Sequence, residues 1–282
     1  MPRFKSVLMN YRHAYHAGNF ADVAKHLAEV AILAHLAKKD APFAVIDSHA
    51  GRGLYDLGSE EARKTGEAKA GIERIRDLPG SVLSGSVLLE RYLGLAIEDG
   101  AGAYPGSPLI AARMLRPQDR LIAIERRPAE AALLKQTLAP WRKARVEEGD
   151  GYARLLAHLP PPERRGLILI DPPFEAPDEF EMAARTVRAA VRKFATGIYL
   201  IWYPIKSTAA GNAFAGEVLA SGAKKALRIE IAIDAAEGKL NQAGLLVLNP
   251  PYGFDSEIEA ALAIVAPRLG ARAKLDWLAG EA

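Results

Sequence analysis

Apolar and polar positions follow two different periods along this chain of 282 residues. Between Phe20 and Lys39, apolar side chains recur every three or four residues, which predicts an amphipathic helix. Short aliphatic runs, which predict buried strands, then alternate with segments of helical period; the runs span residues 43–47, 120–125, 144–147, 166–170 and 197–204. Strands that alternate with helices predict an α/β fold with a doubly wound, mostly parallel sheet.

The last two predicted strands break this alternation. Residues 226–233 and 243–248 are separated by a polar turn without a helical pattern. We therefore expect the two strands to pair antiparallel at one edge of the sheet, the second being the final strand of the chain.

One stretch of the chain lacks a convincing buried strand. Residues 55–104 are charged and dotted with glycine, with only helical patches. We interpret them as a small helical insertion subdomain. Residues 1–54 would then begin the main domain and residues 105–282 would complete it, with Ser107 and Pro108 as the N-cap and first-turn pair of a helix.

Composition narrows the class of protein. Half of the residues are hydrophobic, enough for one large domain or a domain with an insertion. The absence of cysteine excludes disulfides and thiolate metal sites. No apolar run could span a membrane, and the start lacks a signal-peptide core, so we expect a cytoplasmic protein with no membrane partner. The net charge of +3 is too small to indicate nucleic-acid binding by charge alone.

Acidic residues stand at or just after the ends of four successive core strands: Asp47, Glu125, Asp150 and Asp171. Because the carboxyl ends of parallel strands meet at one edge of a sheet, we expect these side chains to line one ligand-binding crevice. Glu125 suits ribose hydroxyls, although it follows Asp47 by 125 − 47 = 78 residues instead of the roughly 20 typical of dinucleotide folds. The predicted insertion accounts for the excess.

The most specific of these strand ends is "LILIDPPFE", Leu167 to Glu175. Neither proline can donate a backbone hydrogen bond, so the strand must stop there. The residues suit a flipped-out base: the carboxylate and a proline carbonyl accept from an exocyclic amine while the ring stacks on the base. A second copy, "NPPY" at 249–252, follows the expected final strand without a series of acid-ended strands before it, and we interpret it as a structural cap.

Similar topology would serve a nicotinamide-dependent dehydrogenase. That class prefers G-x-G-x-x-G after the first strand, which "HAGRGLYD" does not supply, and it gives no reason for "DPPF". The combination favours a methyltransferase that uses S-adenosylmethionine to modify an amino group.

The beginning of the chain is rich in histidine. A metal site formed by His13, His16 and His26 is conceivable, but no pattern such as H-E-x-x-H supports it, and we expect no metal. A polar segment that closes over the crevice explains the Tyr, Arg, Lys and His content better.

Several blocks, in order along nearly the whole chain, carry a more specific signal: "NYRHAYHAGNFADVAKH", "DSHAGRGLYDLGSE", "YPGSPLIA", "RRGLILIDPPFE", "FATGIYLIWYP" and "NPP". Together they resemble the bacterial RlmJ family, the 23S ribosomal RNA adenine-N6 methyltransferases. The resemblance implies a class I S-adenosylmethionine-dependent methyltransferase: Rossmann-like α/β, with a mostly parallel sheet, an antiparallel edge and a small helical insertion subdomain. Relatives often start near the "NYRH" block, so Met9 as initiator is a hypothesis that intact mass of the native protein tests.

The resemblance also implies roles for individual residues. Asp171 matches the family's catalytic aspartate, Tyr11 its RNA-facing tyrosine, and Phe174 stands where relatives commonly have a tyrosine that contacts the substrate. The positions that bind S-adenosylmethionine match His26, His49, Ser107, Glu125, Asp150 and Gly151, with Lys25 beside the first of them.

The function implied is methyl transfer to N6 of one adenine in 23S ribosomal RNA. Asp171 and the Pro172 carbonyl would orient the target amine. We expect a monomer that binds RNA through a local basic face including Arg12 and Lys25. Three alternatives stay open: methylation of adenine in DNA, methylation of guanine in RNA, and a nucleotide- or RNA-binding module without catalysis.

Overall fold

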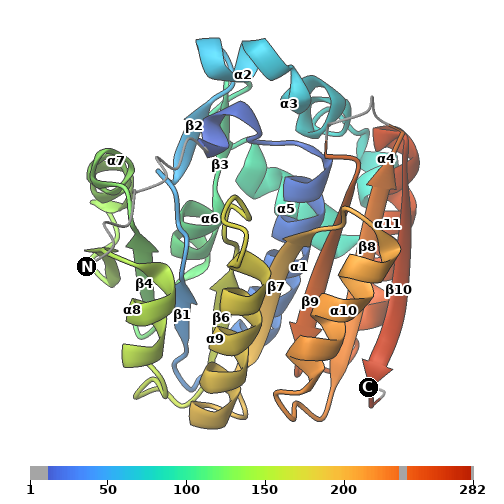
Figure 1. Cartoon of the computed structure of the whole chain (residues 1–282). Helices are drawn as coiled ribbons and strands as arrows, with labels where there is room; N and C mark the ends of the chain where they lie inside the picture. Colours follow the sequence, from blue (N-terminus) through green and yellow to red (C-terminus); the bar gives the residue numbers. More distant parts are fainter. Residues whose placement is uncertain (1–11, 235–239, 281–282) are drawn as a thin grey trace.

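The computed structural model of this chain describes residues 12–234 and 240–280. Its centre is an eight-stranded sheet in the order β10-β8-β9-β7-β6-β1-β4-β5 (Figure 1). Five neighbouring strands run parallel: β7 (Ile198–Pro204), β6 (Gly166–Ile170), β1 (Ala44–Asp47), β4 (Arg120–Glu125) and β5 (Ala144–Glu148). The predicted α/β architecture with a mostly parallel sheet is confirmed.

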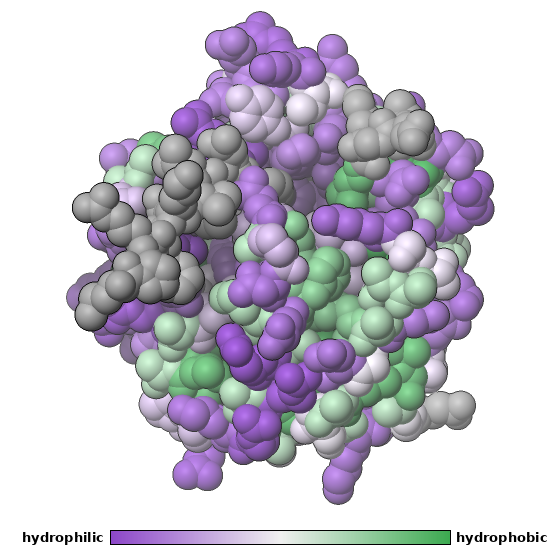
Figure 2. Space-filling view, viewed as in Figure 1, coloured by the Kyte–Doolittle hydropathy of each residue, from purple (hydrophilic) through white to green (hydrophobic). Residues whose placement is uncertain are grey.

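Helices cover both faces of the sheet (Figure 1). One face carries α1 (Phe20–Ala37), α6 (Ser107–Met114), α7 (Pro128–Leu138) and α11 (Phe254–Leu269), and the other carries α8 (Gly151–Ala157), α9 (Glu179–Lys193) and α10 (Thr208–Leu219). Strand side chains alternate between the two cores: in β6, Leu167 and Leu169 join the first and Ile168 and Ile170 the second. The molecule seen from the side of α8–α10 is mostly hydrophilic, with apolar residues across its middle (Figure 2).

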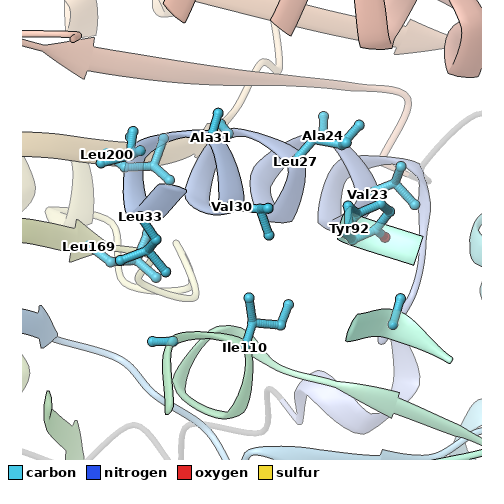
Figure 3. Packing of buried hydrophobic residues seen from close by; sticks show 14 of the residues in the cluster. Val23, Ala24, Leu27, Val30, Ala31, Leu33, Tyr92, Ile110, Leu169 and Leu200 are labelled. Atoms are coloured by element: carbon cyan, nitrogen blue, oxygen red, sulfur yellow. The ribbon is translucent and has the colours of Figure 1, made fainter. Parts of the chain in front are cut away.

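Helix α1 is buried on nearly all sides. Its Val23, Leu27, Val30 and Leu33 are fully buried, and Figure 3 shows this helix between strand residues such as Leu169 and the helices that carry Ile110 and Tyr92. The sequence pattern correctly predicted this helix, but four polar residues on it are buried as well: Asp22, Lys25, His26 and Glu29. Polar groups in such a place need partners, because an unpaired buried charge is strongly destabilising.

The region predicted as an insertion begins and ends in a small sheet. Strands β2 (Leu54–Asp56) and β3 (Ala103–Pro105) pair antiparallel, and between them lie α2 (Glu60–Thr65), α3 (Glu67–Ala70), the 3-10 turn η2 (Ile72–Arg74), α4 (Gly80–Leu83) and α5 (Val87–Ala96). Tyr92 of α5 and Ile72 are fully buried in the same core as α1. The division of the chain at residues 55 and 104 remains a prediction.

The antiparallel part of the sheet is larger than the sequence indicated. β8 (Ala226–Ile233) and β9 (Gln242–Leu248) pair antiparallel as predicted. The prediction that β9 is the final strand is wrong, because β10 (Ala271–Ala279) follows α11 and forms the outer edge beside β8. Half-exposed edge strands tolerate charge, and Arg272, Lys274 and Asp276 interrupt the apolar pattern of β10.

The start of α6 also differs from the prediction. Gly106 is the N-cap of this helix, and Ser107 is its first residue. The Ser107 hydroxyl donates a hydrogen bond to Asp47 Oδ2 at 2.7 Å instead of capping the helix. The buried Asp47 carboxyl group needs a hydrogen-bond partner, because a buried polar group left without one destabilises the fold.

No helix in the described ranges is long and apolar enough to cross a membrane.

Candidate functional site

A crevice opens at the carboxyl ends of β6, β1, β4 and β5, which are adjacent in the sheet. The residues that line it come mainly from these strand ends, from α1 and from the starts of α6, α8 and α9, with His13, Tyr55 and Glu130 added by other elements. They include seven residues predicted from the sequence: His26, His49, Ser107, Glu125, Asp150, Gly151 and Asp171. Residues up to 170 positions apart, 182 − 12 for Arg12 and Met182, thus line one crevice.

Glu125, at the end of β4, is held by backbone groups. Its Oε2 accepts from the Gly51 N–H at 2.9 Å, and its Oε1 accepts from the Arg127 N–H at 2.7 Å. Burial raises the pKa of Glu125 although both hydrogen bonds oppose the shift. Gly51 has φ +64°, and a Cβ there would lie 2.2 Å from the Tyr55 hydroxyl oxygen, so the tight turn requires glycine. The result is a fixed carboxylate on the crevice wall.

Asp150 and Gly151 form the start of α8. Asp150 is the N-cap and accepts from the Ala153 N–H at 3.0 Å. A Cβ at Gly151 would lie 2.0 Å from the Ser48 carbonyl oxygen and 3.0 Å from the His49 ring. The loop after β1 therefore packs directly against the start of α8, and only glycine allows this approach.

Asp47 lies beneath the crevice rather than on its wall, so the expectation that it lines the crevice is wrong. Its carboxylate accepts from the Ser107 hydroxyl at 2.7 Å and from the His49 N–H at 3.2 Å. Burial raises the pKa of Asp47 to about 7, and the Ser107 hydrogen bond opposes the shift. Asp47 thus orients two lining residues from below.

His49 is a neutral ring at ordinary pH. Burial lowers its pKa to about 4. The Ser48 hydroxyl lies 2.8 Å from His49 Nδ1, and the Tyr152 ring packs edge-on at 4.9 Å between centroids. A neutral imidazole can both donate to and accept from a ligand.

Asp171, at the end of β6, forms an ion pair with Lys25. The distance from Lys25 Nζ to Asp171 Oδ2 is 2.5 Å, and Nζ lies 2.8 Å from Asp22 Oδ1. Burial lowers the pKa of Lys25, but the charges of Asp171 and Asp22 outweigh burial and keep this pKa well above its usual value. The expectation that Lys25 belongs to an exposed basic face is therefore wrong, because only 4% of its side chain is exposed.

The other residue of the predicted basic face is Arg12. It is half-exposed, lines the crevice and lies 3.7 Å from Glu61.

The three N-terminal histidines have different partners. His13 Nε2 donates to Asp22 at 2.9 Å, His16 Nδ1 lies 3.0 Å from Glu67, and His26 Nδ1 lies 2.8 Å from the Tyr104 hydroxyl. Burial lowers the pKa of His26, and its Nε2 has no hydrogen-bond partner in the described part of the chain. Within residues 12–234 and 240–280, no cluster of three or more suitable side chains could hold a metal ion.

Phe174 lies outside the crevice lining. Its backbone has φ +50°, its side chain is buried, and its ring packs against Phe180 at 4.5 Å, Trp202 at 5.8 Å and Phe214 at 6.1 Å between centroids. Stacking of Phe174 on a base stays a prediction, and it requires the ring to leave this aromatic cluster. Tyr11 lies outside the described residues.

Several lining residues were missed by the sequence reasoning, and two of them, Tyr152 and Glu179, bond to each other. The Tyr152 hydroxyl donates to Glu179 Oε1 at 2.6 Å, which links the start of α8 to the start of α9 beyond the "DPPF" loop. Tyr152 directly follows Asp150 and Gly151, so its place in the first turn of a helix that begins at the crevice was a usable signal. Glu179 carried no such signal, since acids are common in the first turn of any helix.

Comparisons with known proteins agree with one another. A family model described as "Ribosomal RNA large subunit methyltransferase D, RlmJ" matches residues 40–279. The chain is 38% identical over 287 aligned positions to "Ribosomal RNA large subunit methyltransferase J" of Escherichia coli (strain K12), covering 97% of this chain and 100% of the relative. A relative of the same name in Haemophilus influenzae is 35% identical, with 96% and 97% covered.

A solved structure shows the same fold. Protein LPL1258 of Legionella pneumophila superposes with a TM-score of 0.84 at 34% identity, covering 93% of this chain and 98% of that one. The fold and the acid-lined crevice define a class I S-adenosylmethionine-dependent methyltransferase. Within that class, the chain belongs to the RlmJ family of ribosomal RNA large subunit methyltransferases.

Proposed function

We propose that this protein transfers a methyl group from S-adenosylmethionine to N6 of one adenine in 23S ribosomal RNA. The observation that carries the proposal is the position of Asp171: it directly follows the central strand β6, lines the crevice and is followed by Pro172 and Pro173. Membership of the RlmJ family and relatives named as ribosomal RNA large subunit methyltransferases support it. A cytoplasmic, monomeric protein is part of the same proposal.

The crevice suits the cofactor. Gly151 allows the loop after β1 to pack directly against the start of α8 on the crevice wall, and His26 Nε2 is a buried polar atom on the wall without a partner in the described chain. Glu125, fixed by two backbone N–H groups, suits ribose hydroxyls, and Asp150 suits an adenine amino group. His26, His49 and Ser107 supply the remaining polar contacts. When bound, S-adenosylmethionine supplies an electrophilic methyl group.

The protein's own contribution to the reaction is positioning. The amine of adenine is a poor nucleophile because its lone pair is delocalised into the ring. Hydrogen bonds from that amine to the Asp171 carboxylate and the Pro172 carbonyl would favour a pyramidal nitrogen and hold it in a reactive orientation, a gain from geometry and electrostatics. Asp171 then accepts the proton that the methylated amine releases. Lys25 keeps the Asp171 carboxylate in place.

The experiment that tests the function identifies the product. The purified protein is incubated with labelled S-adenosylmethionine and protein-free 23S ribosomal RNA from a strain that lacks this gene, and the labelled nucleoside is identified after digestion. We expect the label in N6-methyladenosine. Label in a guanine derivative, or transfer only to DNA, would replace the proposed substrate; cofactor binding without transfer to RNA or DNA would indicate a non-catalytic module.

A further inference from the structure

The first turns of α1 bury an ionic group that its apolar surroundings do not explain. Asp22 and Lys25 are each 3% exposed, one turn apart, within a helix whose other faces join the main core. Two buried ions are costly to desolvate, and replacing them by apolar residues would often stabilise a protein. Because the pair lies next to Asp171, we infer that it has a functional role rather than a stabilising one.

Asp22 receives three donors on its two oxygens. Oδ1 accepts from Lys25 Nζ at 2.8 Å, while Oδ2 accepts from His13 Nε2 at 2.9 Å and from the Gly18 N–H at 2.9 Å. Burial raises the pKa of Asp22, but the charges of His13 and Lys25 outweigh burial and hold this pKa well below its usual value. Asp22 is therefore an ionised acceptor that joins the 3-10 turn η1 (His13–Tyr15), the loop at Gly18 and Lys25.

The same contacts fix Lys25. A lysine ammonium is a compact charge on a flexible four-carbon stem, so one carboxylate partner does not set its direction. Here Nζ lies between Asp22 Oδ1 and Asp171 Oδ2, at 2.8 and 2.5 Å. Lys25 in turn contacts Oδ2 of Asp171, which leaves Oδ1 as the oxygen for a target amine in the proposed function.

We propose that Asp22 is a positioning residue for methyl transfer. It directs Lys25 toward Asp171, so that the Asp171 carboxylate is held in one orientation, and it also holds His13, which lines the crevice. Asp22 itself does not line the crevice, so it acts on the reaction through the lining residues that it contacts, and Lys25 is the one that reaches Asp171. The proposal rests on the proposed function of Asp171 as the group that orients the target amine.

Asp22→Asn tests this role, with Glu29→Gln as the matched control. Asparagine keeps the shape of Asp22 but loses its charge and presents an amide N–H₂ to donors. Glu29 lies on the same helix and is fully buried, its oxygens have no hydrogen-bond partner in the described chain, and burial raises its pKa well above the usual value, so glutamine keeps the shape of the side chain and removes no hydrogen bond. We expect Asp22→Asn to lower kcat roughly 100-fold, the size of effect that a misplaced catalytic group produces.

Measuring kcat and cofactor affinity separately distinguishes a positioning role of Asp22 from a general structural defect. Affinity for S-adenosylmethionine, measured by calorimetry, should stay within about threefold of wild type in Asp22→Asn, and both kcat and affinity should do so in Glu29→Gln. A kcat for Asp22→Asn within about threefold of wild type would overturn the proposal. An equal loss of transfer in both variants would also overturn it. Such a loss would show that any change to a buried polar residue of α1 disturbs the helix, with no specific role for Asp22.

A second readout does not depend on transfer. The ¹⁵Nζ resonance of Lys25, assigned by its absence in Lys25→Met, reports the surroundings of the ammonium group. We expect this resonance to shift or to be lost to fast proton exchange in Asp22→Asn and to be retained in Glu29→Gln. If wild type methylates no RNA, the proposed function fails, while this resonance still decides whether Asp22 directs Lys25. An unchanged Lys25 resonance in Asp22→Asn would show that Asp22 does not direct it.

Discussion

Two strands of this protein end in nearly the same four residues, yet only one of these ends lies at the crevice. "DPPF" (171–174) follows β6, and "NPPY" (249–252) follows β9. β9 runs antiparallel to β7, whereas β6 runs parallel to it, so the two motifs lie at opposite ends of the sheet (Figure 1). The direction of the strand decides which motif lies near the other acidic strand ends, and the four residues of the motif do not encode this direction.

The side chains differ accordingly. Asp171 faces the charge of Lys25 and lines the crevice. Asn249 has φ +53° and donates to the carbonyl oxygens of Ala195 and Gly197 at 2.9 and 2.8 Å, which ties the chain ahead of β7 to the end of β9. The hydrogen bonds of Asn249 fit the interpretation of "NPPY" as a structural cap, but its ring is not buried as in a capped strand with a buried ring, because Tyr252 is 86% exposed. The comparison teaches that a motif becomes a site only where the topology brings other functional groups to it.

The largest effect should come from Asp171→Asn. The amide keeps the size of the side chain but offers a weaker acceptor to the target amine and loses its ion pair with Lys25. We expect kcat to fall roughly 100- to 1,000-fold, as when one preorganised electrostatic contact is removed. Single-turnover methylation measures the rate, and calorimetry should show cofactor affinity within about threefold of wild type. An unchanged rate would remove Asp171 from the mechanism.

Gly151→Ala should damage cofactor binding. The new Cβ would lie 2.0 Å from the Ser48 carbonyl oxygen, so the loop after β1 or the start of α8 must move. A displacement of this size should weaken S-adenosylmethionine binding roughly 100-fold, as calorimetry would show. The matched control is Gly216→Ala on the exposed side of α10, where a Cβ meets nothing within 4 Å; it should bind normally and gain about 0.5–1 kcal/mol of stability. Normal binding by Gly151→Ala would show that the crevice wall tolerates the methyl group.

The crevice end of the sheet should also make stability depend on pH. The pKa of Asp47 is raised by burial to about 7, so between pH 4 and 7 the folded state holds a proton that the unfolded state has released. Asp47 therefore makes folding less stable as pH rises through this window, by at most about 1.4 kcal/mol per pH unit. His49, with its pKa lowered to about 4, acts in the opposite direction below about pH 6.5, because the unfolded state then binds more protons.

These two slopes partly cancel in wild type, and Asp47→Asn separates them. The free energy of unfolding of the variant minus that of wild type should rise between pH 4 and 7, which urea titrations at several pH values would measure. The corresponding Asn249→Ala difference should show no such slope. A flat difference for Asp47→Asn would mean that Asp47 is ionised throughout the window.

Asn249→Ala should have the smallest effect and a purely structural one. It removes two hydrogen bonds to carbonyl oxygens and places alanine at a positive φ, so stability should fall by about 1 kcal/mol in urea unfolding. The methylation rate per folded molecule should equal that of wild type. Loss of activity without loss of stability would contradict the assignment of a structural role to "NPPY" and of the catalytic role to "DPPF".

Much of the fold was readable because strands buried on both faces leave unbroken aliphatic runs, as in "GLILI" and "RLIAIE". β10 could not be predicted from the sequence, because this edge strand is partly exposed and charged residues such as Arg272 and Lys274 interrupt its apolar pattern. The acids that end the strands could be assigned to one edge of the sheet from topology alone. Which of them reaches the crevice surface depends on packing, and this is why Asp47 was misplaced.

The role of Lys25 depended on packing in the same way. In the sequence it is one basic residue within a histidine-rich segment, and nothing in its neighbours marks it as buried. The structure brings it to Asp171, 171 − 25 = 146 positions away. Phe174 shows the same limit, since its ring position is set by Phe180, Trp202 and Phe214 rather than by the motif.

A crystal structure with bound S-adenosylhomocysteine would test the central claim most directly. We predict that the ligand occupies the crevice at the ends of β6, β1, β4 and β5, with its ribose at Glu125 and its sulfur facing Asp171. A ligand bound elsewhere, or one whose sulfur lies away from Asp171, would contradict the assignment of this end of the sheet as the site of methyl transfer.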